Sequence, residues 1–76
     1  MNNENRKELE KAISLIDDAK EIIERIKDEE QDKFDNLSEG LQASEKGQKF
    51  EENVSALDDA ISQLEDTIDS INIASE

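Results

Sequence analysis

Residues 50–71 read FEENVSALDDAISQLEDTIDSI, and an apolar side chain recurs in this stretch at alternating spacings of four and three. The apolar positions are Phe50, Val54, Leu57, Ile61, Leu64, Ile68 and Ile71. Because an α-helix turns once in about 3.6 residues, this spacing places them all on one side of a helix. Such a heptad stripe predicts a helix that packs against a second helix.

The first half of the chain carries a similar stripe. Residues 4–35 contain neither Pro nor Gly, so they predict one long helix. Its apolar residues, placed at heptad positions a and d, are Leu9, Ala12, Ile16, Ala19, Ile23 and Ile26. The next a and d positions are Glu30 and Lys33, so the pattern stops after Ile26 and predicts that the helix ends or bends near Phe34.

Turn and cap residues separate the two stripes. Residues 36–45 include Asn36, Ser38, Gly40 and Ser44, and Asn36 has the spacing to Glu39 of a capping box. We expect a short helical turn here, and a last helix that Ser44 caps and an early Gly47 weakens.

The predicted fold is therefore all-α: an antiparallel two-helix coiled-coil hairpin. Its helices cover about residues 4–35 and 46–73, and a connection with a short helical turn covers residues 36–45.

Three apolar residues beside the first stripe have no place in a two-helix seam. Ile13, Leu15 and Ile22 fall at the flanking heptad positions, so the apolar surface of the first helix is wider than one partner helix covers. They predict that two chains pair into a homodimer, a four-helix bundle. The alternative is a monomer in which the second helix covers both stripes.

Composition limits the possible functions. The chain has 76 residues, a net charge of −13, no Cys and no His. That charge repels nucleic acid and anionic membranes. No apolar run approaches the ~18 residues of a membrane span, so a cytoplasmic location is the simplest expectation. Without His to activate a Ser, and without a concave site, we expect no enzyme and no cofactor.

One acidic run invites a calcium interpretation. Counted from Asp28, oxygen-bearing side chains fall at several positions of a twelve-residue calcium loop, ending at Glu39. However, Lys33 occupies the sixth position, where the sharp turn of such a loop requires Gly. A metal site is not expected.

The clearest charge pattern lies in the last helix. Acidic pairs recur every seven residues and no Lys or Arg follows Lys49; the residues are Glu51, Glu52, Asp58, Asp59, Glu65, Asp66 and Asp69. Seven residues rise about 10.5 Å in a helix, whereas duplex DNA carries one negative charge per ~1.7 Å of axis. One such stripe imitates DNA poorly, and two in a dimer come closer. The plain interpretation is a solvated surface that maintains solubility.

The connection resembles a known group of proteins. Residues 28–39 read DEEQDKFDNLSE and residues 41–47 read LQASEKG. This pattern resembles uncharacterised short acidic helix–connection–helix proteins carried by bacteriophages and plasmids, many of which have Pro where this chain has Ser38. The resemblance implies a mobile-element role but transfers no functional residues.

Two functional hypotheses follow. The first is a non-catalytic interaction module whose acidic stripe binds a basic or nucleic-acid-binding host protein, as an inhibitor or nucleic-acid mimic. Phe34, Asn36 and residues 37–47 form a second candidate contact surface. The rival hypothesis is a structural, self-assembling coiled coil, such as a scaffold or spacer.

Overall fold

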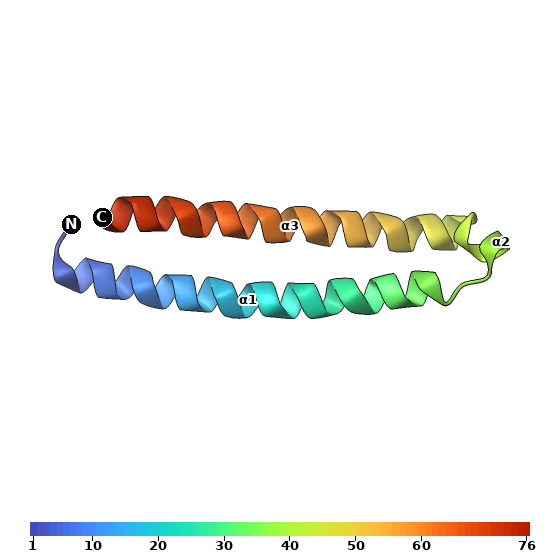
Figure 1. Cartoon of the computed structure of the whole chain (residues 1–76), viewed down its shortest axis with the longest axis horizontal. Coiled ribbons are helices and arrows are strands. Elements are labelled where there is room, and N and C mark those ends of the chain that lie inside the picture. The colour runs from blue at the N-terminus through green and yellow to red at the C-terminus, as the bar shows by residue number, and fades with distance from the viewer.

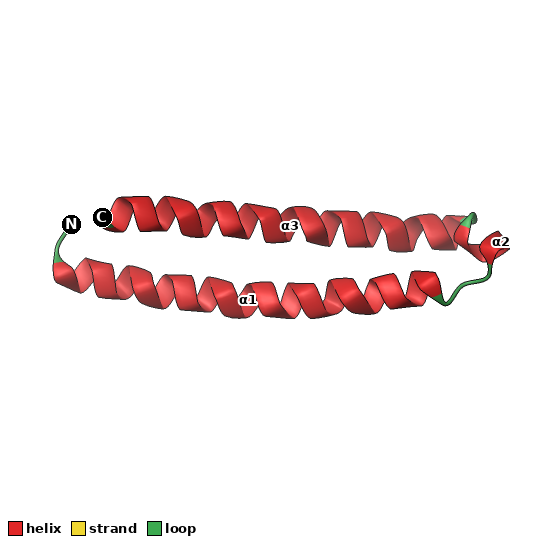
Figure 2. Cartoon of the chain, viewed as in Figure 1, coloured by secondary structure: helices red, strands yellow, loops and turns green.

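The computed structural model, which describes residues 1–76, is a long helical hairpin. Helix α1 covers Asn3–Asp35, the single-turn helix α2 covers Glu39–Gln42, and helix α3 covers Glu45–Ser75. α1 and α3 run antiparallel and pack along their lengths, with α2 at one end and both termini at the other (Figures 1 and 2). The Cα atoms extend over 58 × 15 × 12 Å. The predicted all-helical hairpin is confirmed, and its long helices begin and end within two residues of the expected positions.

Local hydrogen bonds set the helix ends. The Asn2 side chain accepts a bond of 2.7 Å from the Asn5 N–H at the start of α1. At the far end of α3, the Arg6 Nε of α1 donates to the Ser75 carbonyl oxygen at 2.9 Å. A guanidinium is a favourable partner for the unpaired carbonyls of a helix C-terminus, so α1 supplies the cap that the acidic end of α3 lacks.

The expected capping box in the connection is wrong. Asn36 has helical backbone angles, and its N–H bonds to the Asp32 carbonyl, so it ends α1. The N-cap of α2 is Ser38, whose hydroxyl accepts from the Leu41 N–H at 3.4 Å. Ser44 does occupy the N-cap position of α3, but its hydroxyl donates to the Leu41 carbonyl instead of accepting a helix N–H.

The predicted packing register of α1 also needs correction. The half-buried residues include a continuous series at spacings of three and four: Arg6, Leu9, Ile13, Ile16, Lys20, Ile23, Lys27, Glu30, Phe34 and Leu37. Ile26, which the sequence assigned to the seam, is exposed, and so is Lys33, where the sequence pattern had stopped. The series of half-buried residues continues past Ile26 to Leu37, whereas the expected end of the helix near Phe34 agrees with the end of α1 at Asp35. The long stems of Lys20 and Lys27 fill seam positions while their ammonium groups reach the surface.

The core between the two helices is thin. Ile61, near the middle of α3, is the single buried hydrophobic side chain, with 7% of its surface exposed. The other seam residues are half-buried, because two helices can cover only one side of each other.

The other buried residue, Gly47, makes the α2 end tight. A Cβ built on Gly47 would lie 2.1 Å from the Gln42 carbonyl oxygen. The side-chain amide of Gln42 in turn donates from Nε2 to the Phe34 carbonyl oxygen at 3.2 Å. Gly47 thus permits the close approach of α2 to α3, although its sequence position had suggested only a weak helix start.

Candidate interaction surfaces

The acidic surface is a flank of α3. Its seven members are all exposed: Glu51, Glu52, Asp58, Asp59, Glu65, Asp66 and Asp69. Seam residues recur every three or four positions along α3. A residue one position after a seam residue is rotated about 100° around the helix, and a residue two positions after it about 200°, so both point away from α1. The surface is thus a direct product of the heptad pattern.

Two members of the acidic surface contact cations of α1. Lys20 Nζ lies 3.3 Å from Glu65 Oε1, and Lys27 Nζ lies 3.4 Å from Asp58 Oδ1. The two lysine side chains are only 19% and 28% exposed, whereas the two carboxylates are 56% and 66% exposed. Bridges this open to water contribute about 0–1 kcal/mol each. They place one Lys beside each of these two carboxylates and leave the carboxylates accessible.

The remaining five members have no cation within ion-pair distance. No salt bridge or side-chain hydrogen bond within the chain involves the carboxylates of these five residues, which are Glu51, Glu52, Asp59, Asp66 and Asp69. Their negative charge is therefore available to a partner.

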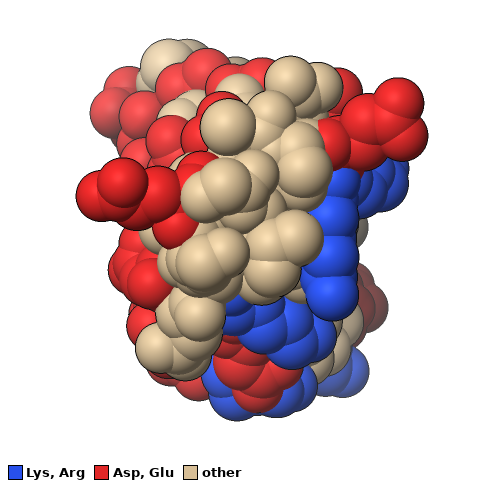
Figure 3. All heavy atoms as spheres, turned by 90° about the vertical axis from the view of Figure 1, so that its right-hand side faces the viewer, with Lys and Arg blue, Asp and Glu red and all other residues tan.

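Basic side chains gather near the α2 end. Lys46 and Lys49 lie in the first turns of α3, and Lys33 lies in the last turn of α1. Figure 3 looks onto this end: blue side chains lie toward the lower right, and red ones dominate the upper left. Because the acidic surface begins directly after Lys49, charge is polarised along α3 as well as around it.

The opposite flank of α3 carries no charge. Its residues precede the seam residues by one or four positions and are all small or uncharged: Asn53, Ala56, Ala60, Gln63, Thr67, Ser70 and Ala74. The matching flank of α1 is apolar between Ala12 and Ile26. We call the two flanks together the uncharged face, and its α1 part comprises Ala12, Leu15, Ala19, Ile22 and Ile26.

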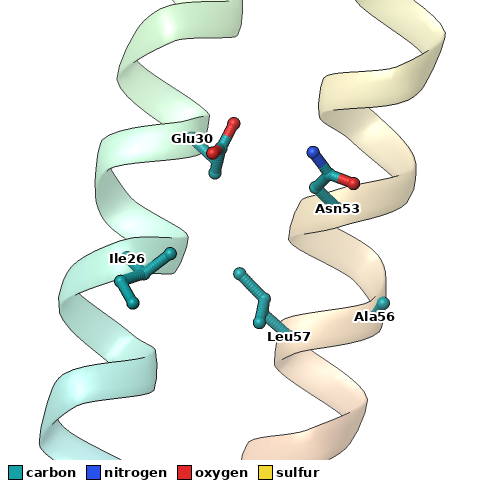
Figure 4. Close-up of a pocket in the computed structure, with 5 residues that line it drawn as sticks. All are labelled: Ile26, Glu30, Asn53, Ala56 and Leu57. Carbon is teal, nitrogen blue, oxygen red and sulfur yellow. The ribbon is translucent and has the colours of Figure 1, made fainter.

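A shallow groove marks where these flanks meet. It has a volume of about 180 Å³ and is lined by Ile26, Glu30, Asn53, Ala56 and Leu57. Figure 4 shows Ile26 and Glu30 extending from α1 toward Leu57 and Asn53 of α3. One Glu30 oxygen is shielded from water without a hydrogen-bond partner, and the other lies 3.8 Å from Lys33 Nζ. The groove holds neither a nucleophile nor a second acid.

The three predicted self-association residues occupy two different places. Leu15 and Ile22 lie on the uncharged face, with 65% and 52% of their surfaces exposed. Ile13 lies instead in the half-buried series that faces α3. Ile26, which the sequence had placed in the seam, is exposed beside Leu15 and Ile22.

The residues considered for metal binding do not converge. Residues 28–35 form the last turns of α1, so their carboxylates point around a helix instead of into a loop. No group of three or more acidic side chains is arranged to hold a metal ion. The second candidate contact surface, Phe34, Asn36 and the connection, lies at the α2 end of the hairpin, with Phe34 and Leu37 half-buried.

Sequence reasoning missed the lysine bridges and the uncharged flank of α3. The signal for the flank was present, since its seven residues also alternate spacings of three and four without one charged member. None of the helices combines the length and the apolar character needed to cross a bilayer. Comparison of the chain with protein-family models, with curated proteins and with solved structures gave no match.

Proposed function

We propose that this protein is a non-catalytic interaction module whose acidic surface binds a basic, nucleic-acid-binding host protein. The observation that supports the proposal most is the five carboxylates of α3 that have no cation inside the chain. A carboxylate row of this kind offers a phosphate-binding protein what it normally finds on nucleic acid. The acidic surface thereby acts as a nucleic-acid mimic, and the resemblance to mobile-element proteins agrees with an inhibitory role.

The proposal includes pairing of two hairpins into a four-helix bundle. One hairpin buries a single hydrophobic side chain, Ile61, and domains of this size rarely gain enough stability from so small a core. Two acidic surfaces per particle also raise the density of negative charge toward that of DNA. The same thin core favours the second candidate function, a self-assembling structural coiled coil whose acids only maintain solubility.

The two functions differ in what the protein binds. The immobilised chain is incubated with a bacterial lysate, washed, and eluted with rising salt. A mimic retains a basic nucleic-acid-binding protein, releases it as salt screens the attraction, and loses it to added duplex DNA. Retention that resists both salt and DNA contradicts mimicry, and retention of nothing but the chain itself favours the structural function.

A charge-reversal pair locates the contact. The test variant changes Glu51, Glu52, Asp59 and Asp66 to Lys, because none of these residues makes an ion pair within the chain. The matched control changes four exposed acids of α1 to Lys: Glu10, Asp17, Glu21 and Asp28. Each variant changes the net charge of −13 by +8, to −5. Only the α3 variant should lose the partner, and equal losses would assign the binding to net charge alone.

A further inference from the structure

We propose that the uncharged face is the surface on which a second copy of this chain docks. This inference rests on the pairing of hairpins in the proposed function and identifies the surface that pairs. Its central residues are Leu15, Ile22 and Ile26 of α1, and Ala56 and Ala60 of α3 lie near Ile26. The acidic surface lies on the opposite side of each hairpin and stays outside the interface.

The large apolar residues of this face are incompletely covered within one hairpin. Leu15, Ile22 and Ile26 are 65%, 52% and 37% exposed. Their spacings of seven and four place them on one line along α1. A monomer thus exposes three large apolar side chains in a row and buries only one. A stable fold of this length needs more apolar side chains buried than exposed.

Charge selects a second copy as the occupant. Each chain carries a net charge of −13, so two copies repel each other wherever their acidic flanks meet. The α3 part of the uncharged face is the flank without acids, and Asn53, Gln63 and Thr67 can still exchange hydrogen bonds there. A basic partner gains nothing on this flank, because its attraction lies with the carboxylates on the other side.

The size of the face suits a dimer. At 1.5 Å per residue, the α3 flank from Asn53 to Ala74 is roughly 32 Å long and the α1 flank from Ala12 to Ile26 is roughly 21 Å long, and each helix is roughly 10 Å wide. The resulting footprint is roughly 530 Å² per chain, so two chains would bury roughly 1,060 Å², which is just above the roughly 1,000 Å² expected of a biological interface. The groove of about 180 Å³ beside Ile26 and Ala56 provides a recess for an apolar side chain of the other copy.

Matched substitutions on the two sides of the hairpin test the assignment. Ile22→Lys places a charge on the uncharged face, and Ile73→Lys makes the same change at a residue that is 70% exposed on the other side of α3. Ala56→Glu and its neighbour Ser55→Glu form a second pair, both at exposed positions. Sedimentation equilibrium measures the mass of each variant, and this readout does not depend on whether a separated monomer stays folded.

The wild-type chain should have the mass of a dimer at micromolar concentration. Ile22→Lys and Ala56→Glu should raise the dimer dissociation constant at least about 100-fold, because each leaves an unpaired charge in the interface. Ile73→Lys and Ser55→Glu should leave it within about threefold, since exposed sites are usually worth less than 0.5 kcal/mol. A monomeric wild type, or equal effects within either pair, overturns the assignment.

Failure here is separable from failure of the proposed function. A monomeric wild type that still captures a basic protein refutes the dimer surface and leaves the acidic contact standing. A dimer that shows the predicted pattern of variants but captures no basic protein supports the dimer surface and refutes the acidic contact.

Discussion

Substitution of Gly47 by Ala should destabilise the hairpin, against the usual effect of this change in a helix. Gly47 lies in the first turns of α3 with no positive φ, so its backbone could carry a side chain without strain. The obstacle is space. The new Cβ would lie 2.1 Å from the carbonyl oxygen of Gln42, 2.6 Å from its carbonyl carbon and 2.7 Å from its Cα. All three atoms belong to the backbone, which cannot rotate away.

The magnitude is the difference of two terms. Ala is about 1 kcal/mol more favourable than Gly inside a helix. Against this, α2 and α3 must separate by about 1 Å or more to reach ordinary contact distances of roughly 3.5 Å. Overpacking of this kind costs about 1–3 kcal/mol, and separation also strains the bond from the Gln42 amide to the Phe34 carbonyl. The expected net loss is about 1–2 kcal/mol, or roughly 5–15 °C in Tm for a domain of this length.

Gly40 provides the matched control. It lies in the single-turn helix α2, and a Cβ built on it meets nothing within 4 Å. Gly40→Ala should therefore raise Tm by a few degrees, since only the helix-propensity gain of about 0.5–1 kcal/mol operates. Thermal unfolding followed by circular dichroism, at one fixed protein concentration, compares the three chains. A Gly47→Ala chain as stable as the wild type would refute the close approach of α2 and α3.

Two further predictions concern the seam and the charge. Ile61→Ala should lower the free energy of unfolding by about 2–5 kcal/mol, as measured by urea unfolding. Ile73→Ala, at a residue 70% exposed, should lower it by less than about 0.5 kcal/mol. Similar losses in the two variants would contradict the place of Ile61 between the helices. Tm should rise when salt is raised from about 0.01 M to about 1 M, which shortens the screening length from ~30 Å to ~3 Å. The reason is that salt weakens the repulsion in a chain with 22 acids and only 9 bases. A falling Tm would mean that the lysine bridges outweigh this repulsion.

The sequence was sufficient to predict the two long helices, the short helical connection and their antiparallel arrangement. In α3 the apolar residues alternate regularly from Phe50 to Ile71 and no competing stripe exists, so the helix and its inner side followed directly. Cap and turn residues located the connection. They did not assign its caps, because Asn36 and Ser38 are both good cap residues and only the backbone angles decide between them.

The inner side of α1 could not be chosen by hydrophobicity alone. Two adjacent stripes compete there, one through Ala12, Ala19 and Ile26 and one through Ile13, Lys20 and Lys27. The second prevails because lysine stems pack like aliphatic chains while their charges meet Asp58 and Glu65. An apolar-only pattern excludes lysine, so it misread both the register and the face that stays free. All seven acids of the acidic surface could be identified from the sequence. Which two of them meet lysines could not.

The two ends of the hairpin are held together by different kinds of contact. At the α2 end the backbones of Gly47 and Gln42 touch, whereas at the other end the Arg6 side chain is the link to the last carbonyls of α3. Any tilt of α3 against α1 about the α2 end would displace the terminal end most. Over a lever of 58 Å, one degree of tilt at the joint moves the free tips by about 1 Å. The close backbone contact at Gly47 therefore sets the geometry that governs the spacing of the helices at the terminal end.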